Sequence, residues 1–120
     1  YAWFGENKKG LDLKHSGIAP IVNLARIYAL AEGIAEVNTL ERLRLAAGTP
    51  SLSQAAAANL IDAFEFLGML RLEHQAKQLE LQAATDSYLL PKHISKLERE
   101  HLKDAFKVIK TLQDSRQASF

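Results

Sequence analysis

The sequence contains no cysteine, which excludes disulfides, thiol nucleophiles and thiolate metal sites and suits a cytoplasmic protein. It also lacks any apolar run near the ~20 residues that a membrane span needs, and its start does not resemble a signal peptide. The net charge is only +1, so no global field draws the chain to nucleic acid or to an anionic membrane. We therefore expect neither a nucleic-acid partner nor a membrane partner.

Motifs of catalysis are lacking as well. G-x-S-x-G, P-loop and G-x-G-x-x-G patterns do not occur, and the four histidines lack the spacing of metal ligands. Nucleotidyl transfer needs closely spaced carboxylates that hold two metal ions. The nearest pair, Glu98 and Glu100, falls within a predicted helix, where the two carboxylates point about 160° apart. We expect no catalytic residue, metal or cofactor in this chain. Because it begins with Tyr1 rather than Met, we expect a fragment of a longer protein that holds the chemistry elsewhere.

What is present suits a single globular domain. The chain has 120 residues, of which 48% are hydrophobic and 24% charged, enough for one hydrophobic core. Residues 1–19 lack helical periodicity, and Gly10 to Lys14 alternates apolar and polar residues. We therefore expect an extended arm or linker over residues 1–19 and a helical domain over residues 20–120.

Capping signals divide residues 20–120 into four helices. Pro20 suits a first turn, and Gly33 closes a helix that covers residues 21–31. Three capping-box patterns follow, each with Glu or Gln three residues after the capping residue. Asn38 opens a short helix that ends near residue 48, Ser51 a long helix over residues 52–82, and Ser95 a last helix that ends near residue 117, after a connector over residues 88–93. The expected fold class is all-α, an antiparallel bundle of about four helices with a short extended N-terminal arm.

The long helix carries the most informative pattern. Its inward face is apolar at Leu60 and Leu67 and then becomes polar at Arg71, His74 and Gln75. A buried arginine is costly unless it is paired, so one interpretation is a cleft that Arg71 and His74 enter. The other interpretation is that the helix outruns its neighbours and these side chains reach water.

The first and last helices carry further charged candidates. The first is apolar nearly all round, so Arg26 should pair with a carboxylate, Asp62 or Asp104, or with an anionic ligand. On the last helix the projection puts Leu97 and His101 on the inward face, His101 as a satisfied core histidine. The opposite face is basic, which fits phosphates, an acidic partner or plain solvent. This stripe consists of Lys96, Arg99, Lys103, Lys107 and Lys110.

Six segments, in order along nearly the whole chain, resemble a known family. They are Lys9–Lys14, Pro20–Val22 with Ala25-Arg26, Asn38–Leu43, Leu60–Leu67, Arg71-Leu72 with His74-Gln75, and Leu102–Ile109. The chain is similar to the nucleotidyltransferase substrate-binding domain. That is the C-terminal helical domain of bacterial signal-transduction proteins that place cyclic-nucleotide-binding-like and CBS modules before a domain like that of PII uridylyltransferase.

The resemblance implies a partner and a division of labour. An N-terminal nucleotidyltransferase domain of the same protein would supply a Gly-Ser turn, metal-binding aspartates, Mg²⁺ and a nucleoside triphosphate. This chain would close one wall of the cleft and hold the nucleotide or a protein acceptor. The residues that the resemblance assigns to substrate binding are Arg71, His74, Gln75, Lys14, Arg26, Arg42, Lys103 and Asp104. Arginine and lysine suit phosphates or an acidic acceptor.

A second hypothesis is a non-catalytic helical interaction module that docks regulatory domains or forms a homodimer. It rests on the N-terminal segment, in which Trp3 and Phe4 could pack on another domain or subunit. Titration with nucleoside triphosphates and Mg²⁺ tests the first hypothesis. Light scattering tests the second, because a strict monomer would argue against a dimerisation module.

Overall fold

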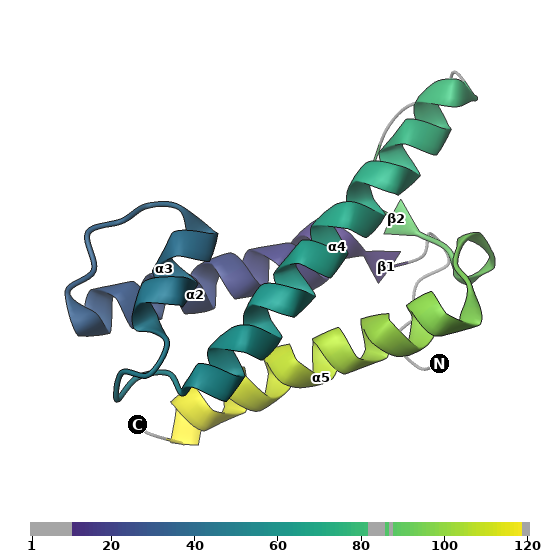
Figure 1. The fold of residues 1–120 in the computed structure, drawn as a ribbon. Helices are drawn as coiled ribbons and strands as arrows, with labels where there is room; N and C mark the ends of the chain where they lie inside the picture. The colour runs from purple at the N-terminus through teal and green to yellow at the C-terminus, as the bar shows by residue number, and fades with distance from the viewer. Residues whose placement is uncertain (1–10, 82–85, 87, 119–120) are drawn as a thin grey trace.

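Four α-helices and a very short β-ribbon make up the fold in the computed structural model, which describes residues 11–81, 86 and 88–118. The all-α fold class is confirmed (Figure 1). The helices are α2 (Ala19–Glu32), α3 (Thr39–Ala46), α4 (Gln54–Glu80) and α5 (Lys96–Ala118). The other elements are β1 (Leu11–Asp12), the π-helical turn η1 (Lys14–Ile18), β2 (Tyr88–Leu89) and the 3₁₀ turn η2 (Pro91–His93).

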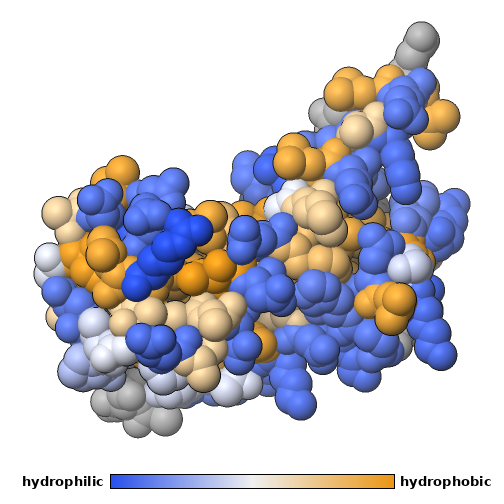
Figure 2. All heavy atoms as spheres, in the orientation of Figure 1, coloured by the Kyte–Doolittle hydropathy of each residue, from blue (hydrophilic) through white to orange (hydrophobic). Residues whose placement is uncertain are grey.

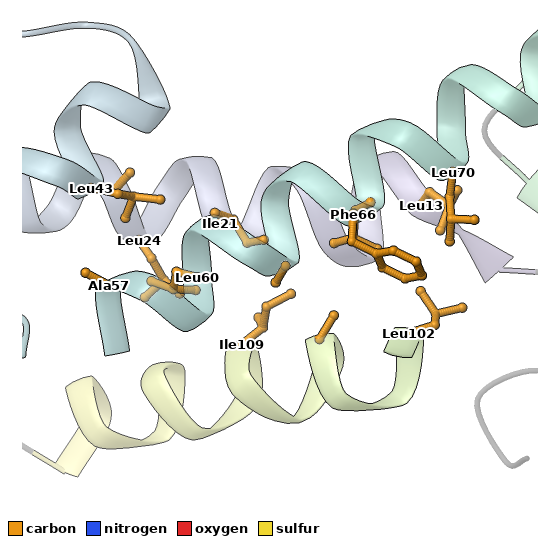
Figure 3. Packing of buried hydrophobic residues seen from close by; sticks show 14 of the residues in the cluster. Leu13, Ile21, Leu24, Leu43, Ala57, Leu60, Phe66, Leu70, Leu102 and Ile109 are labelled. Carbon is orange, nitrogen blue, oxygen red and sulfur yellow. The ribbon is translucent and has the colours of Figure 1, made fainter. Parts of the chain in front are cut away.

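The core lies where α4 packs against α5 and against the η1–α2 segment (Figure 3). Helix α2 in turn packs against α3. Leu60 and Leu67 of α4 are fully buried, and Leu102 of α5 is buried with them. Burying a leucine side chain contributes about 1.5–3 kcal/mol, so this shared cluster is the main source of stability.

The capping residues fix where each helix begins. The Asn38 side chain accepts the Glu41 N–H, and Ser95 and Glu98 each accept the other's backbone N–H, as the sequence predicts. For α4 the predicted cap is wrong. The capping residue is Ser53, whose Oγ accepts the Ala56 N–H. Ser51 instead donates through both its N–H and its Oγ to Glu32, at 3.1 and 2.6 Å. Ser51 thus ties the end of α2 to the α3–α4 loop.

The predicted extended arm is shorter than the sequence pattern suggests. Among the described residues of this arm, only Leu11 and Asp12 form a strand, and they pair antiparallel with β2. The chain then turns helical because Asp12 Oδ1 accepts the backbone N–H groups of Lys14 and His15, as an N-cap does. Leu13 is fully buried, so this segment joins the packed body. Residues 1–10 of the predicted arm, including Trp3 and Phe4, lie outside the described residues.

Helix α4 is longer than the body that it crosses. Its 27 residues extend about 40 Å at 1.5 Å per residue, and the molecule measures 45 × 28 × 22 Å. Its N-terminal half lies over the core, and its C-terminal half projects beyond the other helices (Figure 1). The outward face of the projecting half is therefore not covered by the other described helices.

Two predicted helix faces need correction. Leu97 of α5 is 84% exposed rather than inward, because the α5 face that meets the core is centred on Leu102, Ala105 and Ile109. Helix α2 is buried on one side only. Its Leu30 and Arg26 are exposed, so the expectation that this apolar helix is buried on most sides is wrong. Half of α2 faces solvent because α3 covers only part of it.

Candidate functional site

The polar half of α4 is organised around one carboxylate, that of Asp86. Asp86 Oδ1 accepts hydrogen bonds from His74 Nε2 at 3.2 Å, from Gln78 Nε2 at 3.1 Å and from the Tyr88 N–H at 3.0 Å. The Asp86 N–H donates to Gln78 Oε1 at 2.9 Å, and Gln75 Nε2 donates to the Asp86 carbonyl oxygen at 3.4 Å. The inward polar face thus binds Asp86, which lies two residues before the start of β2.

His74 is the buried member of this network. Its side chain is 7% exposed, at the end of the inward stripe that Leu67 and Leu70 form. Because a carboxylate only accepts, the His74 Nε2 atom carries the proton in this hydrogen bond. Burial alone would raise the pKa of Asp86, but the hydrogen bonds from Gln78, Tyr88 and His74 outweigh it and hold that pKa below the ordinary 3.8.

A small concavity lies beside His74. It has a volume of about 30 Å³, which is the space of about one water molecule. Helix α4, β2, η2 and the start of α5 line it, with His93 facing His74 at a ring-centroid distance of 5.7 Å. Partial burial and the nearby His74, Lys92 and Lys77 lower the pKa of His93. This space is too small for a nucleotide.

The concavity beside His74 does not include Arg71, the other residue of the predicted cleft. Arg71 is half-buried. Of the three polar residues predicted on this face, the structure brings His74 and Gln75 together on Asp86.

A larger groove runs along the exposed side of η1 and α2. It has a volume of about 390 Å³ and is lined by Lys14, Ile18, Ala19, Val22, Asn23 and Arg26. We call it the Lys14–Arg26 groove. Its floor is apolar, and a cation stands at each end. The ion pairs between described residues include neither Lys14 nor Arg26.

The π-helical turn helps to align this groove. The Ala19 N–H bonds to the Lys14 carbonyl oxygen, five residues back, so η1 turns less per residue than an α-helix. In an α-helix, two side chains four residues apart are rotated by about 40° about the helix axis. The wider π-helical turn offsets part of this rotation between Lys14 and Ile18. Lys14 therefore lies on the same side as Val22 and Arg26. The sequence spacing alone would have placed Lys14 and Arg26 about 120° apart.

The remaining predicted site residues lie apart from this groove. Arg42 Nε donates to the Glu36 carbonyl oxygen at 2.6 Å, so it holds the α2–α3 loop. Lys103 and Asp104 are exposed neighbours on α5. The structure therefore divides the predicted set into four locations, the Asp86 network, the Lys14–Arg26 groove, the α2–α3 loop and α5, and leaves Arg71 half-buried on α4 outside all four.

The structure corrects two predictions, the partner of Arg26 and the burial of His101. Asp62 does not pair with Arg26, because Asp62 Oδ2 lies 3.0 Å from His101 Nε2. His101 is not a core histidine, since its side chain is 40% exposed. Its ring stacks on Phe66 with 3.6 Å between the centroids, which fastens α5 to α4. Arg26 is exposed because none of the described helices covers the side of α2 that carries it.

Sequence reasoning missed Asp86, the residue that the polar face binds. A signal for it exists, since Asp86 is followed by a serine and both lie between a predicted helix and the Tyr88-Leu89 pair, where aspartate and serine are common turn residues. Within the described part of the chain, His, Asp and Glu side chains do not gather in groups of three that could hold a metal ion. The described helices include none that is both long and apolar enough to cross a bilayer.

With this geometry established, comparison with known proteins defines the class. Residues 2–120 match the family described as "putative nucleotidyltransferase substrate binding domain". The match spans almost the entire chain, so the protein belongs to this family of helical domains that accompany nucleotidyltransferases. No curated protein and no solved structure matches the chain.

Proposed function

We propose that this domain holds the anionic part of a nucleotidyltransferase substrate in the Lys14–Arg26 groove. This assignment rests on two cations from separate family-like segments that lie at the ends of one open groove and form no ion pair with another described residue. Guanidinium and ammonium groups bind phosphates and carboxylates through charge-assisted hydrogen bonds. Family membership supports the assignment to substrate binding.

The groove has the chemistry of a nucleotide-sized ligand. A volume of about 390 Å³ lies within the usual range of small-molecule sites. The apolar floor of Ile18, Ala19 and Val22 suits a base or another flat apolar group, and the Asn23 amide can accept or donate a hydrogen bond. Lys14 and Arg26 stand about three helical turns apart, so one phosphate cannot reach both. An extended anion, a triphosphate or an acidic acceptor loop, can.

The chemical step belongs to another domain of the intact protein. The described residues do not assemble a metal site, and the domain family is one that accompanies a nucleotidyltransferase. In this proposal the catalytic domain is uridylyltransferase-like and supplies the metal-binding aspartates, Mg²⁺ and the bound nucleoside triphosphate. The present domain forms one wall of the cleft and fixes the position of the nucleotide or of the protein acceptor. CBS and cyclic-nucleotide-binding-like modules would then regulate the same protein.

The test compares two double variants of the intact protein. Lys14→Gln with Arg26→Gln removes both cations of the groove. Lys96→Gln with Lys107→Gln removes two exposed cations of α5 and serves as the control. Charge-assisted hydrogen bonds contribute about 1.5–3 kcal/mol each, so we expect the groove variant to raise the substrate KM by about tenfold or more. The control should stay within about twofold. An unchanged KM in the groove variant contradicts the proposal.

Titration of the 120-residue chain with a nucleoside triphosphate adds a direct readout. Amide resonances of Ala19, Val22 and Asn23 should shift together, and those around Asp86 should not. Shifts confined to Asp86 and His74 would move the binding site to the end of α4.

A further inference from the structure

The amphipathic character of α4 inverts halfway along the helix. In the N-terminal half the inward face is apolar, and the outward face carries Asp62 and Glu65. In the C-terminal half the inward face is polar, with His74 bonded to Asp86. The outward face of that half is apolar and consists of Met69, Leu72, Ala76 and Leu79, all of them exposed. We call these four residues the outer stripe.

The outer stripe faces away from the body of its own domain. At 100° per residue its centre lies roughly opposite His74. Leu72 is 69% and Leu79 65% exposed. The orange surface along the projecting end of α4 in Figure 2 shows the same apolar character. Scattered exposed leucines are ordinary, but an aligned row on a projecting helix marks an interaction site.

The spacing of the outer stripe fits a helical occupant. Its residues follow one another at intervals of three, four and three, the a and d positions of a heptad repeat. Such a row packs into the grooves of another helix, knobs into holes. A lipid surface fits less well, because Glu73 and Glu80 flank the stripe and anionic lipids favour lysine and arginine there.

We propose that the occupant is the same half of α4 from a second copy of this chain, running antiparallel. With the pair centred at position 74, Leu72 packs on Ala76 of the second copy and Met69 packs on its Leu79. Large side chains then meet small ones at the centre, which suits interdigitation. Antiparallel pairing also leaves the two bodies at opposite ends, clear of each other, because this half of α4 projects (Figure 1).

Charge favours the antiparallel arrangement over the parallel one. A parallel, in-register pair would place Asp62 against Asp62 and Glu65 against Glu65, because these acids continue the same row toward the N-terminus. In the antiparallel pair both acids pass beyond the end of the other α4, which ends at Glu80. The projecting half itself carries two cations, Arg71 and Lys77, and two anions, Glu73 and Glu80, so its net charge is zero.

The test begins with the mass of the 120-residue chain by analytical ultracentrifugation over a concentration series. The stripe covers only about three turns, so we expect a weak dimer that forms at about 10–100 μM. The weight-average mass should rise from 13.3 kDa toward twice that value. Leu72→Glu should weaken association at least tenfold. Leu97→Glu, which changes a still more exposed leucine on α5, should leave association unchanged.

The absence of cysteine allows a second experiment on orientation. Met69→Cys and Leu79→Cys are made as separate variants, purified and mixed under oxidising conditions. Antiparallel pairing should give a disulfide between the two variants in the mixture, and Met69→Cys alone should give almost none, since its own copies lie ten residues out of register.

Three outcomes overturn the proposal. A chain that stays monomeric to about 1 mM has no dimer of even millimolar strength, and the stripe then serves another partner. A dimer that Leu72→Glu does not weaken uses another surface. Efficient disulfide formation by Met69→Cys alone indicates parallel pairing. Circular dichroism of Leu72→Glu should match the wild type because residue 72 is exposed, so loss of the dimer cannot be ascribed to unfolding. None of these outcomes depends on the Lys14–Arg26 groove.

Discussion

Replacing Asp86 by alanine is the most direct way to test whether the polar face of α4 stabilises the fold by binding Asp86. The change removes the carboxylate oxygen that accepts hydrogen bonds from His74, Gln78 and the Tyr88 N–H. It leaves the backbone of residue 86 free to keep its bonds with Gln78 and Gln75. We expect the domain to stay folded and to lose stability.

The magnitude follows from the exposure of each group. The Asp86 side chain is 47% exposed, so solvent screens its three hydrogen bonds to about 0.5 kcal/mol each. His74 is buried and would keep an unsatisfied Nε2–H, which costs about 1 kcal/mol. The total loss is about 2–2.5 kcal/mol. The entropy of unfolding of a 120-residue domain is about 0.25 kcal/mol/K, so Tm should fall by about 8–10 °C.

Calorimetry and urea denaturation at pH 7 measure this loss. Asp114→Ala is the matched control, because Asp114 forms an exposed pair with Lys110 at 3.7 Å and its removal should cost less than about 0.5 kcal/mol. If Asp86→Ala lies within about 0.5 kcal/mol of the wild type, the network does not stabilise the fold and the reasoning is refuted. The polar face would then be open for a ligand.

The pH dependence gives an independent check with a defined sign. The folded pKa of Asp86 is below its ordinary value of 3.8. The contribution of Asp86 to the free energy of unfolding is therefore complete above the unfolded pKa and disappears as pH falls through the folded pKa. The stability difference between the wild type and Asp86→Ala should be largest near neutral pH and should shrink progressively once pH falls below about 4. A difference that grows toward acid pH contradicts the assignment.

Three further changes test other parts of the structure. Gly68→Ala should stabilise the domain by about 0.5–1 kcal/mol in urea denaturation, because the glycine lies inside α4 and an added Cβ meets no atom within 4 Å. A loss of stability would show that the helix is not regular there. Ser95→Ala should cost about 1 kcal/mol in the same assay, since Ser95 Oγ caps α5 through the Glu98 N–H. His74→Gln should raise the pKa of His93 toward its ordinary value in an NMR titration, because His74 is among the groups that lower it. An unchanged His93 pKa would show that His74 does not influence the titration of His93.

The helices were predictable because their start signals are local. Asn38 and Ser95 cap the helices that the sequence assigns to them, and Gly33 adopts a positive φ of 67° at the end of α2. Ser51 and Ser53 are a harder case. Both serines precede the same helix, and only the tertiary contact of Ser51 with Glu32 shows that Ser53 is the capping residue. Local patterns locate a helix end to within a few residues and no better.

The candidate site was less predictable because it depends on which residues meet. The continued inward face of α4 correctly places His74 inside. Its partner, Asp86, is twelve residues along the chain, and helical periodicity carries no information about it. The Lys14–Arg26 groove depends on the π-helical turn, which no spacing rule anticipates. Arg26 was expected to be paired because α2 reads as apolar all round, but apolarity does not tell which side lacks a covering helix.

The inversion of α4 explains why one helix serves both the domain and its surroundings. Leu60 and Leu67 fix the rotation of the helix, since a straight helix cannot turn one half relative to the other. Once they are buried, His74 must point inward and Leu72 outward, although transfer free energies alone favour the opposite. Asp86 offsets the cost of the inward histidine by accepting its hydrogen bond. Nothing within the described residues covers the outward Leu72, which is 69% exposed. The rotation that the core imposes therefore creates both the internal polar network and the outer stripe.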